Sequence, residues 1–178
     1  MAYADHNDEQ SLPKKVGGWL LFAAGFGFSK FVGATFLVPF ACSALALFLL
    51  RKFRSDPSSL TVTLALALGH VSWFVAGAIL MPALLGQVGL DILIISALVA
   101  WTLLRVSIAP VALLMAYELF SLVVNGVALS EAPTMSLPFR ALLVHILWHL
   151  LTIGFGVAYL AFGRTPKDSQ DADGAEFY

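Results

Sequence analysis

The chain has 178 residues, of which 60% are hydrophobic and 12% are charged, and its formal net charge at pH 7 is -1. Soluble domains usually carry about twice this charged fraction, so the composition favours a membrane protein, and the lack of a basic stripe argues against a nucleic-acid partner. The single cysteine, Cys42, excludes an intramolecular disulfide and a cysteine-based metal cluster.

Polar tails flank the apolar part of the sequence. Residues 1–12 are acidic and are predicted to be disordered, and residues 165–178 form a second polar, acidic tail. Residues 13–164 are predicted to form one transmembrane helical domain. A cleavable signal peptide is not expected, because the first apolar run is too long and acidic residues precede it.

The first apolar block covers residues 16–50. As a single helix it would be about 50 Å long, which exceeds a hydrocarbon core of roughly 30 Å. Lys30 interrupts the block, so we predict a tight hairpin at residues 29–34 between a short first span and a second span. In the alternative, residues 16–28 lie in the interface or re-enter without crossing.

The middle of the chain contains one span and then another overlong block. Residues 60–85 are predicted to form the span, with a turn at residues 86–89 after it. The apolar block of residues 90–129 exceeds the length of one span, and Arg105 and Pro110 lie near its middle. We therefore divide this block into spans at residues 90–106 and 110–129.

The last apolar run lies between Arg140 and Arg164 and contains no fixed charge. Positive charges decide between four and six spans. With six spans, eight of the ten lysines and arginines fall inside, and Lys30 and Arg140 fall outside. With four unbroken spans, four fall on each side and two are left in lipid. The sequence therefore predicts an all-α polytopic transmembrane helix bundle with six spans and both termini cytoplasmic; five or four spans are the alternatives.

A short motif near the N-terminus suggests a relationship. The run Lys15-Val16-Gly17-Gly18-Trp19-Leu20, with its glycine-rich continuation to Gly33, resembles the opening of a family of small bacterial multi-pass membrane proteins of unassigned function. In this chain Lys30 stands where that family often has proline. The resemblance implies a bacterial multi-pass membrane protein, and we expect its location to be the bacterial inner membrane.

Three histidines are candidates for a cofactor site. His70 and His149 lie about ten residues into their predicted spans, so both are expected near mid-membrane. His145 lies one helical turn from His149 on the same face. Histidines at matched depth can hold haem b, and an i, i+4 pair can bind zinc if further ligands are supplied. The alternative is that each histidine only hydrogen-bonds a neighbouring helix.

Glu118 lies about a third of the way into its predicted span. A lone carboxylate at this depth would be protonated or paired with a histidine. With His70 or His149 it could form a path for a proton or a small solute, which Asn125 could join. The alternative is a single hydrogen-bonded acid within the bundle.

The sequence contains no motif that assigns an activity. It lacks a nucleotide-binding loop and a Gly-x-Ser-x-Gly motif, which argues against an enzyme. We expect a small accessory or interaction protein whose partners are the lipid bilayer, other membrane proteins or a second copy of itself. Two alternatives are a haem- or metal-binding redox protein that uses the histidines, and a transporter of a small solute or proton.

Overall fold

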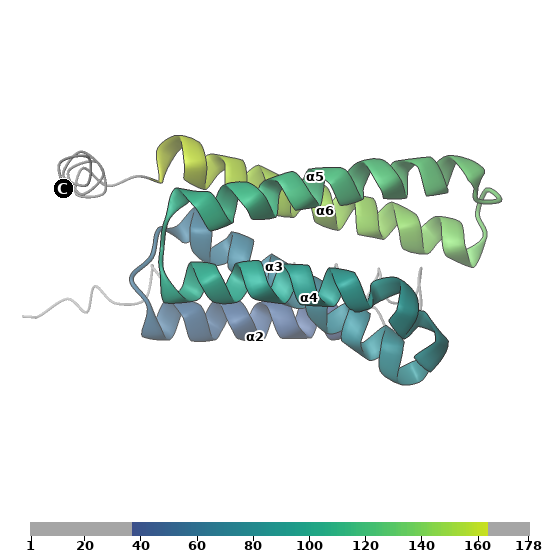
Figure 1. Cartoon of the computed structure of the whole chain (residues 1–178), viewed down its shortest axis with the longest axis horizontal. Coiled ribbons are helices and arrows are strands. Elements are labelled where there is room, and N and C mark those ends of the chain that lie inside the picture. The colour runs from purple at the N-terminus through teal and green to yellow at the C-terminus, as the bar shows by residue number, and fades with distance from the viewer. Residues whose placement is uncertain (1–36, 164–178) are drawn as a thin grey trace, which may run out of the picture.

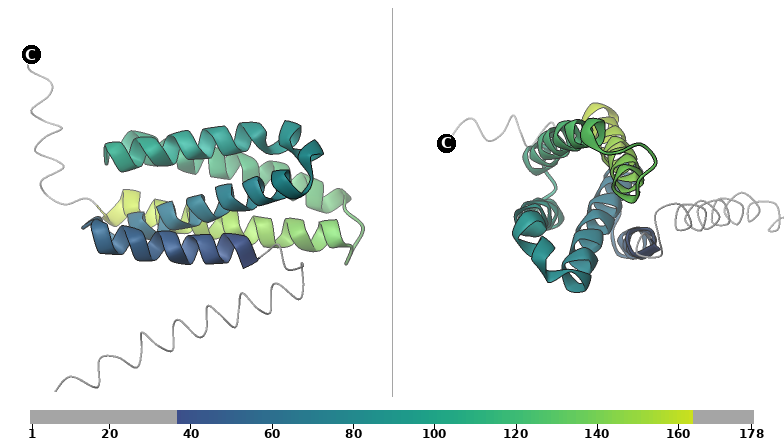
Figure 2. Two further views of the ribbon diagram at one scale, coloured as in Figure 1. Left: turned by 90° about the horizontal axis from the view of Figure 1, so that it is seen from below. Right: turned by 90° about the vertical axis from the view of Figure 1, so that its right-hand side faces the viewer.

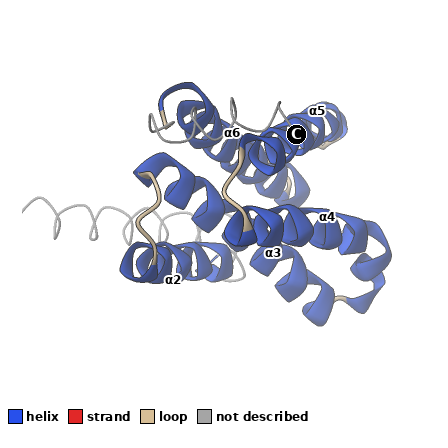
Figure 3. Cartoon of the chain, turned by 60° about the vertical axis from the view of Figure 1, so that its left-hand side comes forward, coloured by secondary structure: helices blue, strands red, loops and turns tan. Residues whose placement is uncertain are grey.

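The computed structural model describes residues 37–163, and within this range the chain forms helices joined by short loops, with no strand. The long helices run side by side along the length of the molecule (Figure 1), and only short loops separate them (Figure 3). The elements are α2 (Leu37–Phe53), α3 (Ser58–Leu80), the 3-10 turn η2 (Pro82–Leu84), α4 (Leu85–Leu104), α5 (Ile108–Glu131) and α6 (Leu137–Phe162).

Four of the described helices are long and apolar enough to cross a membrane: α3, α4 together with η2, α5 and α6. By contrast, α2 has 17 residues. Its length is therefore about 25 Å, which is short for a core of roughly 30 Å. The prediction of six spans is not supported by the described residues. The predicted span at residues 16–28, the hairpin at residues 29–34, the Lys15–Leu20 motif and both tails lie outside them.

The break in the block of residues 90–129 was placed correctly. Between α4 and α5 the chain leaves the helix after Leu104 and re-enters it at Ile108, so that Pro110 falls in the first turn of α5. The predicted turn at residues 86–89 is wrong, because these residues lie within α4. The chain turns earlier, at Met81 and Pro82, since proline has no N–H to continue the α3 hydrogen-bond ladder.

The four longer helices form a closed ring in the order α3, α4, α5, α6, in which each helix contacts the next and α6 returns to α3. The shorter α2 packs against the outside of α3, as the end-on view in Figure 2 shows. Arg54 fastens one end of this arrangement: its Nη1 donates a hydrogen bond of 2.7 Å to the Leu103 carbonyl oxygen, and its guanidinium pairs with Asp56. The α2–α3 turn therefore lies at the same end of the bundle as the α4–α5 turn.

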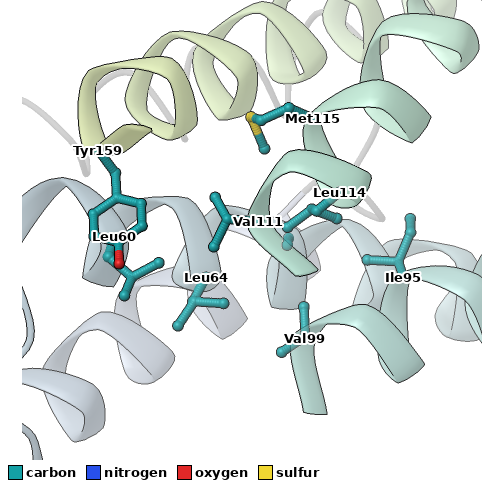
Figure 4. Close-up of a cluster of buried hydrophobic side chains, with 9 residues drawn as sticks. Leu60, Leu64, Ile95, Val99, Val111, Leu114, Met115 and Tyr159 are labelled. Carbon is teal, nitrogen blue, oxygen red and sulfur yellow. The ribbon is translucent and has the colours of Figure 1, made fainter. Parts of the chain in front are cut away.

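Apolar side chains fill the ring and also cover its outside. Large side chains such as Ile79, Leu93 and Phe120 are exposed on the surface of the bundle. Helices that are apolar on all sides are typical of membrane spans. Toward the Arg54 end the ring is closed by one apolar cluster contributed by all four helices (Figure 4). This cluster consists of Leu60, Leu64, Ile95, Val99, Val111, Leu114, Met115 and Tyr159, together with Ala67.

Candidate functional site

Four ionisable side chains meet inside the ring. His70 comes from α3, Glu118 from α5, and His145 and His149 from α6. All four are buried; the most exposed of them, His145, retains 8% of its accessible surface. They lie beyond the apolar cluster of Figure 4, near the middle of their helices. The three histidines and the glutamate selected from the sequence therefore occupy a single site.

The three imidazoles pack directly against one another. Ring centroids are 4.5 Å apart for His70 and His145, 4.8 Å for His70 and His149, and 4.6 Å for His145 and His149. The Nε2 atoms of His70 and His145 are 2.6 Å apart. One ring nitrogen from each histidine lies within 4.8 Å of the other two. This is a three-nitrogen cluster of the size that one metal ion can bridge.

Glu118 lies close to two of these imidazoles, those of His149 and His70. Its Oε2 accepts a hydrogen bond from Nδ1 of His149, and its Oε1 lies 3.7 Å from Nδ1 of His70. A carboxylate that accepts from Nδ1 fixes the tautomer in which Nε2 carries a free lone pair. Glu118 thus leaves Nε2 of His149 available as a ligand. Oε1 of Glu118 and Nδ1 of His70 have no hydrogen-bond partner.

Asn125, the fifth residue selected from the sequence, lies at the edge of the same cluster. Its Nδ2 is 3.3 Å from Nε2 of His149 and donates a hydrogen bond of 2.8 Å to the Ser121 carbonyl oxygen. Because the shorter bond is made to its own helix, the contact with His149 is the weaker of the two. Asn125 therefore borders the cluster rather than anchoring it.

Aromatic rings from α3 pack against two of the imidazoles. The ring of Phe74 is 4.6 Å from that of His70, and the ring of Trp73 is 4.9 Å from that of His145. On α6, Nε1 of Trp148 donates a hydrogen bond of 2.9 Å to the Leu66 carbonyl oxygen and so joins α6 to α3. These rings limit the access of water to the imidazoles.

Gly69, which the sequence analysis did not select, permits this close packing. A Cβ atom on Gly69 would lie 2.7 Å from the Pro39 carbonyl oxygen and 2.9 Å from Cζ2 of Trp148, and would collide with Oγ of Ser43. The absence of a side chain therefore lets α2 and α6 approach α3 immediately beside His70. The one sequence signal for this contact is the position of the glycine next to a histidine in an apolar helix.

Asp91 on α4 is a further acidic residue, and its side chain is half-buried. The hydroxyl group of Tyr117 on α5 donates a hydrogen bond to Oδ1 of Asp91 on α4. The hydrogen bond connects two helices, α4 and α5, that the histidine cluster does not join.

Comparisons of the chain with protein-family models, with curated proteins and with solved structures found no match.

Proposed function

We propose that the protein is an integral membrane protein that binds a transition-metal ion through His70, His145 and His149. The main support for this proposal is the cluster of three buried imidazole nitrogens, one from each histidine, within 4.8 Å of one another. With metal–nitrogen bonds of about 2.0–2.1 Å, tetrahedral ligands lie about 3.3–3.4 Å apart. The 2.6 Å pair of His70 and His145 would have to widen by less than about 1 Å, and a pair at the outer limit of 4.8 Å would have to close by about 1.4 Å.

Glu118 supports this assignment as a positioning residue. Histidines that bind metals usually donate their other ring N–H to a carboxylate, which orients the imidazole and strengthens it as a ligand. The bond between Glu118 and Nδ1 of His149 is of this kind, and the other oxygen of Glu118 lies 3.7 Å from Nδ1 of His70. Three imidazoles leave a fourth coordination position for water or for an exchangeable ligand.

The packing of the rings favours a metal ion over haem b. A bis-histidine haem requires the macrocycle to lie between its two axial imidazoles. Here His145 is stacked on His149 and bonded to His70, and the Trp148–Leu66 hydrogen bond draws α6 onto α3. A metal ion needs only small movements of the side chains, whereas haem would require the two helices to separate.

Charge supports an orientation in the bacterial inner membrane. Within residues 37–163, four of the five lysines and arginines lie at the bundle end that carries Arg54, and Arg140 lies at the other end. Positive residues concentrate on the cytoplasmic side, so we assign the Arg54 end to the cytoplasm. The C-terminal end of α6 lies on the same side of the membrane in this orientation. A cytoplasmic N-terminus stays a prediction, and so do an accessory role and solute transport.

A Co²⁺ titration of the detergent-purified protein tests the metal site. In a Cys42→Ala background, which removes the thiol, we expect one Co²⁺ per chain with the absorption bands of a tetrahedral site. Single substitutions His70→Gln, His145→Gln and His149→Gln should each weaken binding by more than about a hundredfold, and Glu118→Gln by about 10–100-fold.

His6→Gln is the matched control, because His6 is the remaining histidine of the chain and lies in the acidic tail. This variant should bind Co²⁺ as the parent does. Failure of the parent protein to bind Co²⁺, or an equal loss in the His6 variant, would refute the metal site. A Soret band in the purified protein that disappears in the His70 and His149 variants would instead favour haem.

A further inference from the structure

Asn125 presents a hydrogen-bond donor to the nitrogen of His149 that a bound metal ion would use. Its Nδ2 lies 3.3 Å from Nε2 of His149 and donates a hydrogen bond of 2.8 Å to the Ser121 carbonyl oxygen. A carbonyl oxygen only accepts hydrogen bonds, so the contact with Ser121 requires the nitrogen of the amide, and not its oxygen, at this position. The amide of Asn125 is therefore fixed with its nitrogen toward His149.

The contact at the other ring nitrogen of His149 defines the donor and the acceptor. Because Oε2 of Glu118 accepts from Nδ1, Nε2 carries the lone pair and accepts from Asn125. A proton on Nε2 would instead bring two N–H groups face to face at 3.3 Å. Asn125 and Glu118 thus favour the same tautomer of His149.

A metal ion bound to Nε2 of His149 would take the lone pair to which Asn125 donates. The N–H group of Asn125 would then need another acceptor close to the ion, since its distance of 3.3 Å from Nε2 is roughly that between two ligands of one tetrahedral ion. An imidazole nitrogen that binds the ion has no second lone pair to offer. The acceptor that remains is the fourth ligand, which three histidines leave to an exchangeable molecule.

The helices pack less tightly on the side of the site where Asn125 lies. No residue is buried in residues 71–80 of α3, 85–94 of α4 and 119–131 of α5, and Asn125 itself is half-buried. On the other side of the histidines, the apolar cluster of Figure 4 fills the ring. A small ligand therefore meets fewer closely packed side chains on the Asn125 side.

We propose that the fourth position of the metal site takes a small anion that binds through oxygen or nitrogen, and that Asn125 donates an N–H bond to the coordinating atom. The inference rests on the proposed function. Asn125 is a positioning residue and not a ligand, because its bond to Ser121 keeps the amide oxygen away from His149. The coordinating atom must keep a lone pair after it binds the metal, as an oxygen of formate or the terminal nitrogen of azide does. An anion is favoured over water, since a hydrogen bond to a charged acceptor is the stronger.

Titrations of the Co²⁺-loaded protein with azide and with cyanide test this role through the Co²⁺ absorption bands. Both probes are small anions with one negative charge, but cyanide binds through a carbon atom whose lone pair the metal takes. The ratio of their affinities therefore isolates the hydrogen bond to the coordinating atom. In the Cys42→Ala background, Asn125→Leu should lower the preference for azide over cyanide by about tenfold.

The affinity for Co²⁺ itself separates a positioning residue from a ligand. Asn125→Leu should bind Co²⁺ within about threefold of the parent and keep the spectrum of a tetrahedral site, because the three imidazoles remain. Asn125→Gln keeps an N–H donor on a longer side chain and should recover part of the preference for azide. Gln87→Leu is the matched control: Gln87 is the other side-chain amide within residues 37–163, it is exposed on α4, and its loss should leave both anion affinities unchanged.

Three results would overturn the inference and leave the metal site standing. The first is a preference for azide in Asn125→Leu equal to that of the parent. The second is a large loss of Co²⁺ affinity with a changed spectrum in this variant, which would make Asn125 a ligand. The third is a parent that binds Co²⁺ but not azide. If Asn125→Leu does not fold, Asn125→Ala removes the same donor. Failure of the parent to bind Co²⁺ refutes the proposed function itself and is distinct from all three.

Discussion

The close packing of α2, α3 and α6 at Gly69 predicts that a larger residue at this position lowers the stability of the protein. In the variant Gly69→Ala, the new Cβ would have to separate from the Pro39 carbonyl oxygen by about 0.7 Å, from 2.7 Å to the 3.4 Å of ordinary contact. It would also press on Ser43 and Trp148, so that α2, α3 and α6 cannot all keep their positions. Overpacking of a core costs about 1–3 kcal/mol.

The contact of Gly69 with a backbone carbonyl places the substitution near the upper end of that range. Alanine regains about 1 kcal/mol of helix propensity over glycine, so the expected net loss is about 2 kcal/mol. For a chain of this size, that loss lowers the midpoint of thermal unfolding by roughly 4–8 °C. The midpoint can be measured in detergent by circular dichroism.

Two kinds of variant separate the crossing from a general effect of removing glycine. A Cβ on Gly154 meets no atom within 4 Å, so Gly154→Ala should be neutral or slightly stabilising. Adding Ser43→Ala to Gly69→Ala removes one of the colliding atoms, an Oγ that has no hydrogen-bond partner, and should recover about 1 kcal/mol. The packing argument fails if Gly69→Ala is as harmless as Gly154→Ala.

Two other predictions follow from contacts between helices. Trp148→Phe removes the N–H that bonds to the Leu66 carbonyl oxygen and should cost about 1 kcal/mol by thermal unfolding; an unchanged midpoint would show that this bond does not hold α6 to α3. Reporter fusions after Arg54 and after Arg105 should both give cytoplasmic signals, since the Arg54–Leu103 bond joins these turns at one end; opposite signals would contradict the assigned orientation.

The positions of the helix breaks were only partly predictable from the sequence. Arg105 and Pro110 marked the α4–α5 break correctly, because a charged residue and a proline both disfavour the interior of a span. The glycines at positions 86 and 89 predict a turn that the structure does not contain, because residues 86–89 lie within α4. In an apolar environment the helix satisfies its own backbone, so Gly86 and Gly89 remain helical and Pro82 determines the turn.

The similar depth of His70 and His149 followed from helix rise, since both lie at similar distances along their helices, but their direct contact did not. The contacts of Gly69 and Asp91 did not, because they depend on how each helix is rotated about its axis. In a soluble bundle the apolar stripe reveals that rotation. Here the helices are apolar on nearly every side, so the sequence carries little information about which faces meet.

The spacing around His70 supports a site prepared for a cation. Its Nε2 is 2.6 Å from His145, closer than the roughly 3.3 Å of two nitrogens on one tetrahedral ion, and its Nδ1 is 3.7 Å from Glu118, too far for a hydrogen bond. The two nitrogens lie on different sides of the ring. A shift of about 0.7 Å away from His145 and toward Glu118 would correct both distances at once. Metal binding would thus give Nδ1 of His70 and Oε1 of Glu118, both buried without a partner, the hydrogen bond that each lacks.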